Sequence, residues 1–346
     1  FRWNSAFVQK EFYCVSVHIM SWKTCTLLVI LTFFNQYRAC PYRVAPSLKY
    51  TLLNASMTSQ TVVANVIKVL DNFDGVTITV DKQFLPKLCC DMMNLDHRIQ
   101  EIVFGAGSIR YIEATCFSRS VQNVTKRIDF SFNALTSIKN GTFKDLDIVN
   151  LFLRHNFIET LEDGAFFNLT KLRRISLETN NLQVLNSRAF SSLPSLHILD
   201  LRRNHIRSLQ DGALSFLEKD ALIWLSCNKI FQIGNFLEGI SLKFKLELDL
   251  DGNKIKSFSG NIVENRTFEI LNLANNPLEN ISAVLSSREI VRLEFSCGYL
   301  TLKDVQSVVN WAKARGILLN RCSQYNMSFG LGSSSVPCSS TRLVLK

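Results

Sequence analysis

A pattern of apolar residues returns about every 24 residues along most of this chain, and it constrains the fold more than any other feature. The pattern reads L-x-x-L-x-L-x-x-N, with leucine, isoleucine or phenylalanine at the L positions. A repeat of this length predicts that one small structural unit is stacked many times into a solenoid. Asparagine fills the last position in seven consecutive copies: Asn133, Asn156, Asn180, Asn204, Asn228, Asn253 and Asn276.

Alternation within each copy predicts a short β-strand, because side chains at every second position point to the same face. The apolar side chains then point inward, and successive strands pair in parallel. The asparagine amide both donates and accepts hydrogen bonds, so a stack of asparagines satisfies the backbone where the chain leaves the strand. A phenylalanine ten residues after this position is expected to pack beneath the outer side: Phe117, Phe143, Phe166 and Phe190.

These motifs resemble the extracellular leucine-rich-repeat family with repeats of about 24 residues, and some secreted insect immune proteins in particular. The resemblance implies an α/β repeat solenoid, a horseshoe with a parallel concave β-sheet and caps at both ends. We expect about nine repeats over residues 99–297 and an N-terminal cap over 40–98. That cap contains a degenerate repeat at Ile78 and Val80. Residues 298–346 form a C-terminal cap, with a helix near 305–314, and a Ser-rich tail.

The start of the chain resembles a secretory signal peptide. Met20 opens a segment that contains Lys23 and the apolar run 25–34, and Ala39 is a suitable cleavage point. We therefore expect a signal peptide over 20–39 and an upstream segment foreign to the native protein over 1–19. The alternative, a membrane-spanning helix, needs about twenty apolar residues, more than this run supplies. The expected mature protein has no membrane span.

Glycosylation motifs agree with secretion. Seven Asn-X-Ser/Thr sequences follow the expected signal peptide, and together they are much stronger evidence than a single copy. The expected acceptors are Asn54, Asn123, Asn140, Asn168, Asn265, Asn280 and Asn326. We therefore expect a secreted, extracellular glycoprotein.

Eight cysteines follow the expected signal peptide, and an oxidising compartment favours their pairing. Cys40, Cys89, Cys90 and Cys116 belong to the N-terminal cap, where the vicinal pairing is the least favoured. Cys297 and Cys322 bracket the C-terminal cap and are expected to form a disulfide. Cys227 lies three expected strands before Cys297, about 14 Å away, so these two do not bond. Cys338 either links two chains into a disulfide-linked oligomer, closes locally or stays an inert thiol.

The variable outward residues of the strands form the candidate binding face. Aromatic and arginine side chains dominate many protein interfaces, and both gather in the central repeats. An acidic region follows at Glu247, Asp249 and Asp251. The alternative interpretation is that these are ordinary solvent-exposed side chains with no role in binding. The candidate ligand-binding residues are Phe152, Arg154, His155, Arg174, Arg202, Arg203 and Trp224, with both aromatic rings expected to be exposed.

The function expected from the sequence is binding through this face, and catalysis is not expected. The sequence has no recognisable hydrolase, phosphate-binding or metal-binding motif, so we expect no enzyme activity, cofactor or metal. The net charge is +10, but basic residues are scattered, which argues against nucleic-acid binding. We expect a secreted protein that binds a protein ligand or receptor, in innate-immune recognition or as a soluble co-receptor. The alternative is a matrix protein that binds acidic polysaccharide.

Overall fold

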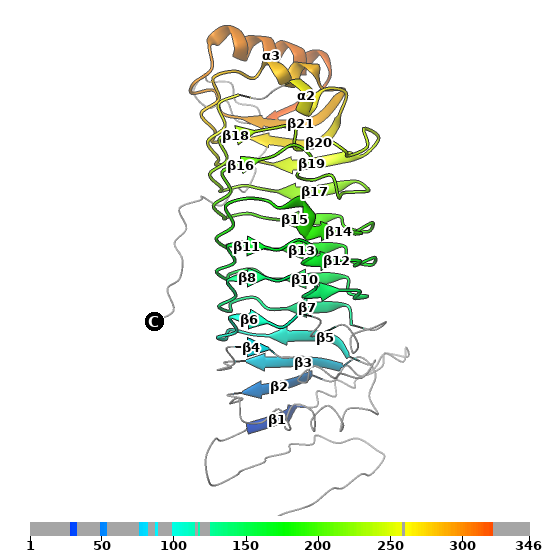
Figure 1. Cartoon of the computed structure of the whole chain (residues 1–346). Helices are drawn as coiled ribbons and strands as arrows, with labels where there is room; N and C mark the ends of the chain where they lie inside the picture. The colour runs from blue at the N-terminus through cyan, green and yellow to red at the C-terminus, as the bar shows by residue number, and fades with distance from the viewer. Residues whose placement is uncertain are drawn as a thin grey trace, which may run out of the picture.

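A long β-sheet runs the full height of the molecule in the computed structural model (Figure 1). The structure describes strands at 28–32, 49–53, 76–81 and 87–88, then residues 99–114, 117, 125–257 and 260–320. The described residues form thirteen strands in this sheet. In spatial order they are β1 (Leu28–Thr32), β2 (Lys49–Leu53), β3 (Val76–Asp81), β5 (Ile99–Phe104), β7 (Arg127–Asp129), β10 (Asn150–Phe152), β13 (Arg174–Ser176), β15 (Ile198–Asp200), β17 (Ala221–Trp224), β19 (Lys245–Asp249), β20 (Thr267–Leu273), β21 (Glu289–Phe295) and β22 (Leu318–Asn320).

Every pairing in this sheet is parallel except that of β1 with β2. The repeat pattern predicts nine strands from Ile99 to Phe295, and β5 to β21 supply them. Strand β3 places Ile78 opposite Ile102, the relation that a degenerate repeat in the N-terminal cap predicts. Strand β1 lies inside the segment that the sequence assigns to a signal peptide, and that assignment stays a prediction.

The other side of each coil carries very short strands and few helices. The small sheets are β4 (Lys87–Leu88) with β6 (Tyr111–Ile112), β8 (Ser137–Ile138) with β11 (Thr160–Leu161), β9 (Phe143–Lys144) with β12 (Phe166–Phe167) and β14 (Phe190–Ser191), and β16 (Ser208–Leu209) with β18 (Gln232–Ile233). The described helical segments are the 3-10 helices η2 (Ser187–Ala189) and η3 (Ser282–Ser286), and the helices α2 (Gly260–Val263) and α3 (Leu302–Ala314). The predicted solenoid with its parallel sheet is confirmed. Its helices are fewer than the α/β description suggests, because short strands and turns occupy most of the segments between the strands of the large sheet.

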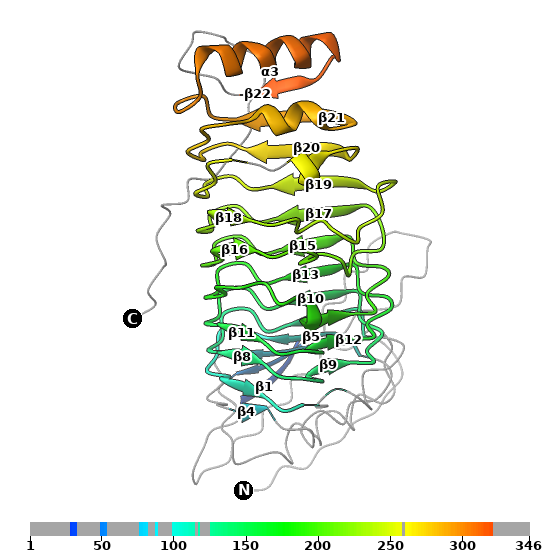
Figure 2. The same ribbon diagram turned by 45° about the horizontal axis from the view of Figure 1, so that its top comes forward.

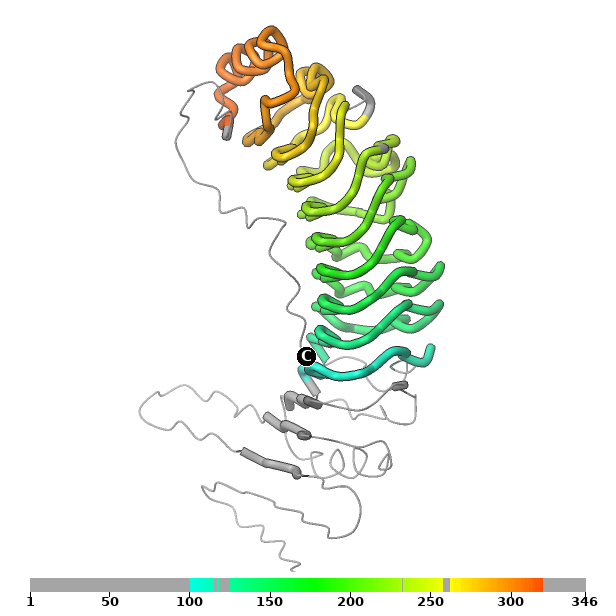
Figure 3. The backbone as a smooth tube through the Cα atoms, turned by 90° about the vertical axis from the view of Figure 1, so that its left-hand side faces the viewer, coloured from blue at the N-terminus to red at the C-terminus, as the bar shows by residue number. Residues whose placement is uncertain are grey.

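The coils stack in a gentle arc (Figure 3). Helix α3 lies across one end of the stack beside β22 (Figure 2). It buries Val305, Val308 and Ala312, and the N-cap residue Thr301 accepts a hydrogen bond from the Asp304 backbone at 3.1 Å. This helix covers the last coil, as the terminal unit of a repeat array must do to shield the core.

The asparagine stack predicted from the pattern is confirmed. Asn180 Nδ2 donates to the carbonyl oxygens of Leu153, in the preceding coil, and of Leu177, in its own coil, at 3.0 and 2.9 Å. Its Oδ1 accepts from the Ile158 backbone at 3.0 Å. The other six asparagines repeat this arrangement and are at most 6% exposed. Each buried amide therefore joins two coils, and the array is held together by hydrogen bonds as well as by apolar packing.

A column of stacked phenylalanines fills the space behind the sheet, as the pattern predicts. Ring centroids of Phe117 and Phe143 are 5.8 Å apart, those of Phe143 and Phe166 are 5.8 Å apart, and those of Phe166 and Phe190 are 5.1 Å apart. The sequence analysis missed the continuation to Phe216, at 4.6 Å from Phe190. Offset aromatic stacking adds to the burial of each ring, so the column fixes the spacing between coils.

Candidate binding face

The register of the sheet lines up the predicted outward residues in columns. Phe152 lies between Asp129 and Ser176, and Trp224 lies between Asp200 and Asp249. The neighbouring outward position of β13 is occupied by Arg174. The turns that leave β10 and β15 carry Arg154 with His155 and Arg202 with Arg203. All seven predicted ligand-binding residues therefore lie on the concave sheet or at its edge.

Arginine side chains lie over aromatic rings across this face, in a cluster that we call the arginine–aromatic ladder: Arg127, Phe152, Arg174, Arg202 and Trp224. The guanidinium carbon of Arg127 lies 4.7 Å from the ring centroid of Phe152, and that of Arg174 lies 5.5 Å from the same ring. Arg174 also lies 5.7 Å from the Trp224 ring, and Arg202 lies 4.8 Å from it. Each ring therefore has two guanidinium groups close to it, an attractive arrangement because the ring face is electronegative.

This stacking corrects one prediction. The sequence predicts that Phe152 and Trp224 are exposed, but both side chains are half-buried. Their neighbours cause the difference, because the alkyl stems and flat guanidinium groups of the arginines cover the ring faces. The ladder therefore presents ring edges and guanidinium planes held in place.

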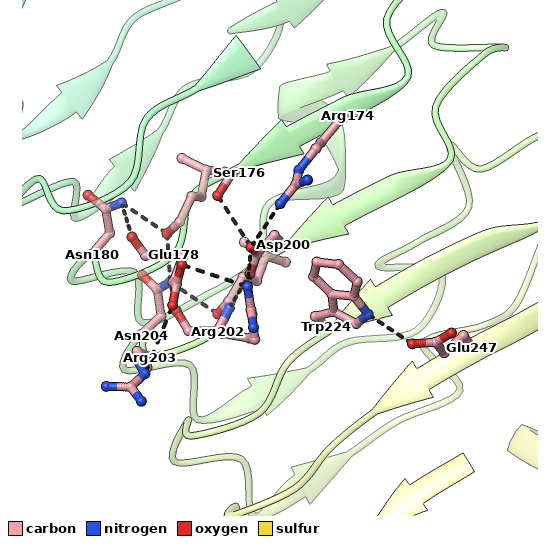
Figure 4. A network of polar contacts seen from close by, with 12 residues as sticks. Arg174, Ser176, Glu178, Asn180, Asp200, Arg202, Arg203, Asn204, Trp224 and Glu247 are labelled. Carbon is pink, nitrogen blue, oxygen red and sulfur yellow. Dashed lines mark hydrogen bonds and ion pairs between the residues drawn. The ribbon is translucent and has the colours of Figure 1, made fainter. Parts of the chain in front are cut away.

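Asp200 anchors the centre of the ladder (Figure 4). Its carboxylate is fully buried and accepts hydrogen bonds from Nε and Nη2 of Arg202, each at 2.8 Å. Ser176 donates to it at 3.3 Å, and Arg174 lies 4.0 Å away. The hydrogen bonds to Asp200 raise the pKa of the Arg202 guanidinium above its ordinary value. A bidentate pair of this kind fixes the guanidinium plane as well as its charge.

Further carboxylates balance the remaining cations of the central face. Arg127 is paired with Asp129 at 2.7 Å. Glu178 lies 3.7 Å from Arg202 and 4.0 Å from Arg203. The arginine side chains thus keep their positions without a ligand, and the face has much less free positive charge than its arginine content suggests.

Trp224 is fixed at its polar end. Its indole Nε1 donates to the carboxylate of Glu247 in the next strand at 3.1 Å (Figure 4). Because this hydrogen bond and the two cation contacts hold the indole in one orientation, little side-chain entropy remains to be lost on binding. A pre-positioned tryptophan is well suited to anchor an interface.

The acidic region beyond Trp224 is a hydrogen-bonded network. Asp249 accepts from Asn272 at 2.9 Å and from the backbone of Asp251 at 3.1 Å. Asp251 accepts from Asn275 at 2.7 Å. Burial raises the pKa of the Asp249 carboxyl above its usual value. The predicted change from a basic to an acidic face along the array is present.

An aromatic rim that the sequence analysis missed borders the face, formed by Phe132 and His155. Phe132 is 45% exposed and stacks on His155, with ring centroids 4.3 Å apart and planes 7° apart. The guanidinium of Arg154 lies 5.9 Å from the Phe132 centroid. Partial burial in this stack disfavours the charged imidazole and lowers the pKa of His155 below its ordinary value.

The rim residues share an unusual backbone conformation. The residue just before the stacked asparagine has a positive φ in several coils: Phe132, His155, Thr179, Arg203, Cys227, Gly252 and Asn275, at 52° to 65°. Glycine and asparagine tolerate this left-handed region most easily. The phenylalanine immediately before Asn133 is the sequence signal that could have predicted the rim.

The described glycosylation motifs lie away from the concave strands. Asn140, Asn168, Asn265 and Asn280 are all exposed. Asn168 follows β12 on the outer side, and Asn280 precedes η3. These positions leave the strands of the concave sheet free of acceptor sites among the described residues. Asn54, Asn123 and Asn326 lie outside the described residues.

Two of the predicted cap and repeat cysteines are described, and both are disulfide-bonded: Cys227 and Cys297. They lie in coils three strands apart, as predicted, so each has a different partner. The other cysteines named from the sequence lie outside the described residues: Cys40, Cys89, Cys90, Cys116, Cys322 and Cys338.

Metal binding and membrane insertion depend on features of the fold that can be stated for the described residues. Among the described residues, no group of three or more histidine, cysteine or acidic side chains is arranged to hold a metal ion. In the same part of the chain, no helix combines the length and the apolar character that a membrane crossing requires.

A family model described as Leucine rich repeat matches residues 147–206, the coils that carry the centre of the ladder. This match and the stacked parallel coils agree. The fold is that of a leucine-rich-repeat protein. No curated protein sequence matches the chain.

Solved leucine-rich-repeat structures are similar at low identity. The crystal structure of a TLR13–ssRNA13 complex has 18% identity and a TM-score of 0.51, over 70% of this chain and 38% of that one. The LRR protein LIC12759 of Leptospira interrogans has 18% identity and a TM-score of 0.44, over 72% and 73% of the two chains. The LRIM1/APL1C complex has 14% identity and a TM-score of 0.47, over 70% and 47%. The chain thus spans well under half of the TLR13 chain, and the first similarity supports the fold alone.

Proposed function

We propose that this leucine-rich-repeat chain is a secreted glycoprotein that binds a protein ligand through the arginine–aromatic ladder on its concave face. The observation that carries the proposal is the contact of arginine guanidinium groups with the rings of Phe152 and Trp224, with Asp200 holding Arg202 in place. Innate-immune recognition or soluble co-receptor activity is the biological setting in which we place it, following the resemblance to secreted immune proteins.

Interface chemistry supports a protein ligand. Tryptophan and arginine are enriched among residues that dominate binding energy, especially where neighbouring groups hold them in place. The sheet from β7 to β21 offers a face about 35 Å long, which suits a macromolecule better than a small metabolite. The exposed acceptor sites for glycans leave this sheet open.

Charge pairing argues against the alternative of acidic-polysaccharide binding. A sulfated or carboxylated polymer is attracted mainly by free cations, and such binding weakens as salt screens the charges. Arg127 and Arg202 are already bonded to Asp129 and Asp200. A polyanion would have to compete with these carboxylates at the centre of the face.

The test is affinity capture from extracellular fluid with the glycosylated protein secreted by cells. It is run beside a variant with Phe152→Ala and Trp224→Ala and beside the control Phe231→Ala. Phe231 is 60% exposed and lies outside the concave sheet, next to β18. A protein recovered with the parent and the control but lost with the double variant supports the proposal. Equal recovery with all three overturns it.

The salt dependence of recovery distinguishes protein binding from acidic-polysaccharide binding in the same experiment. Recovery that persists at 1 M salt, where the Debye length is about 3 Å, supports a protein interface built on aromatic contacts. Recovery of heparin-like polymer alone, abolished by salt, supports the matrix alternative.

A further inference from the structure

Arg174 differs from the other two arginines of the ladder in its hydrogen bonds. Arg127 donates to Asp129 at 2.7 Å, and Arg202 donates to Asp200 twice at 2.8 Å. The Arg174 side chain makes no hydrogen bond within the described residues, and its buried Nε–H is without an acceptor there. A buried donor without an acceptor is uncommon in folded proteins, so it calls for a physical reason.

Asp200 is the carboxylate that lies near Arg174, but its acceptor positions are already filled (Figure 4). Its Oδ2 lies 4.0 Å from Nη2 of Arg174, a distance too long for a hydrogen bond. A carboxylate offers about four acceptor positions. Those of Asp200 receive Nε, Nη2 and the backbone N–H of Arg202, and the hydroxyl of Ser176. Arg174 is therefore attracted to Asp200 without being hydrogen-bonded to it.

The ion-paired cluster around Asp200 has more cations than anions. It consists of three guanidinium groups and two carboxylates, on Arg174, Arg202, Arg203, Asp200 and Glu178. The cluster thus has one excess positive charge. The unused donors of Arg174 are where an incoming anion can form hydrogen bonds without displacing a carboxylate of the cluster.

Two aromatic rings lie close to the Arg174 guanidinium. Its carbon is 5.5 Å from the ring centroid of Phe152, in β10, and 5.7 Å from that of Trp224, in β17. The side chain is nevertheless 33% exposed, so a ligand can reach it. Rings at this distance exclude part of the water around a bound anion, and a lower local dielectric strengthens its attraction to the guanidinium.

We propose that Arg174 determines the specificity of the ladder by binding the carboxylate of an aspartate or glutamate side chain on the protein ligand, a role that rests on the proposed function. A planar guanidinium binds a carboxylate through two parallel hydrogen bonds, and both partners are charged. The rings of Phe152 and Trp224 contact the residues beside that acidic side chain. One acidic residue matches the one excess charge of the cluster.

The carboxylate comes from a side chain rather than from the C-terminus of the ligand. A C-terminal carboxylate is commonly held by a nest of backbone N–H groups. Around Arg174 these groups are used inside the sheet: the Leu153 N–H donates to Ser176, and the Leu177 N–H donates to Asp200, each at 2.8 Å to a backbone oxygen. Recognition of the anion at this place is therefore left to the guanidinium, which an acidic side chain can reach.

Selection of random short peptides tests the assignment without a known ligand. The peptides are displayed with their C-termini fused to a carrier and are selected on the secreted, glycosylated protein. Selected peptides are then synthesised with amidated C-termini. We expect an Asp or Glu at one position of the peptides whose binding is lost in Trp224→Ala. Replacing it by Asn or Gln is expected to raise Kd roughly tenfold or more. This change lies in the peptide, so it leaves the fold of the protein unaltered.

Variants of the protein complete a double-mutant cycle. Arg174→Gln is expected to bind the acidic peptide and its amide counterpart with Kd values within about twofold of each other, because the coupling is lost. Arg174→Lys keeps the charge without the planar fork and is expected to show an intermediate preference. The control is Arg188→Gln, whose side chain is 81% exposed and belongs to η2 outside the concave sheet. It is expected to behave as the parent does.

Other outcomes overturn the assignment and are distinct from failure of the proposed function. Peptides that need Trp224 but bind equally well as acid and amide contradict the role of Arg174 and leave the ladder as the binding face. The same holds if Arg174→Gln still prefers the acidic peptide. Binding that requires a free C-terminus assigns the carboxylate to the chain end. Selected peptides that bind Trp224→Ala as tightly as the parent contradict the proposed function itself.

Discussion

Arg202 lies over the face of Trp224, with its guanidinium carbon 4.8 Å from the ring centroid, and Asp200 holds it there through two hydrogen bonds of 2.8 Å. The three side chains come from two neighbouring strands and the turn between coils. A contact surface built in this way is fixed before a ligand arrives, which reduces the entropy cost of binding.

Asp200→Ala is expected to destabilise the fold. It removes a fully buried carboxylate, leaving Arg202 and Ser176 without their acceptor. Because the Arg202 side chain is 34% exposed, water compensates in part, and the expected loss in unfolding free energy is about 2 kcal/mol. Urea unfolding measures it. The control Asp163→Ala, whose side chain is 58% exposed, is expected to lose less than about 1 kcal/mol. Equal losses would contradict the anchoring role.

Asn180→Ala tests the stacked asparagines. The substitution removes one of the two asparagine donors to each of the carbonyls of Leu153 and Leu177, and it leaves the buried Ile158 amide without its acceptor. Two lost hydrogen bonds and one unsatisfied buried amide together cost about 3 kcal/mol. Chemical unfolding of this variant is compared with that of Gln183→Ala, an exposed neighbour expected to change stability by about 0.5 kcal/mol at most. An unchanged midpoint for Asn180→Ala would show that the stack is dispensable.

Opposite effects are expected from two glycine exchanges at one repeat position. Thr179 has φ +57°, and its buried hydroxyl has no hydrogen-bond partner among the described residues. Thr179→Gly relieves left-handed strain and removes that hydroxyl, for a net gain of about 0.5–1 kcal/mol. Gly252→Ala, at φ +65°, is expected to lose about 1 kcal/mol. Thermal unfolding measures the change in stability of both variants, and a lower melting temperature for Thr179→Gly than for the parent would contradict the expected gain.

His155 is expected to titrate below its ordinary pKa. Burial against Phe132 disfavours the charged imidazole, so the unfolded chain binds this proton more readily than the folded protein does. The contribution of His155 to stability is therefore full above pH 6.5, its unfolded pKa, and falls as the pH decreases through the folded pKa. An NMR titration measures it in the parent and in Phe132→Ala, where removal of the ring moves the pKa back toward 6.5. A pKa above 6.5 in the parent would refute the stated cause.

The sequence predicts the repeat architecture well because each repeat position has one physical task. Inward leucines, the stacked asparagine and the phenylalanine at the outer side recur with the period, so Asn180 and Phe166 could be assigned without coordinates. Strand β3 was found in the same way. Strand β22 was not, because the apolar run 317–319 carries no copy of the pattern.

Contacts between outward side chains were harder to predict. The columns follow from the register, but burial of the Phe152 and Trp224 rings depends on how far Arg174 and Arg202 extend across neighbouring strands. Asp200 has the same pattern position as Asp249 and Asn272, which are only partly buried, and its own contacts explain why it is fully buried. The pattern leaves outward positions free, so it holds little information about them.

The central claim is tested most directly by the affinity of Trp224→Ala for the purified captured protein, measured by surface plasmon resonance beside the parent and Phe231→Ala. Loss of an interface anchor costs about 2 kcal/mol or more, so we predict that Kd rises roughly 30-fold or more. The control is expected to stay within about twofold of the parent, as surface changes outside an interface do. A Kd for Trp224→Ala equal to that of the parent would contradict binding through the ladder.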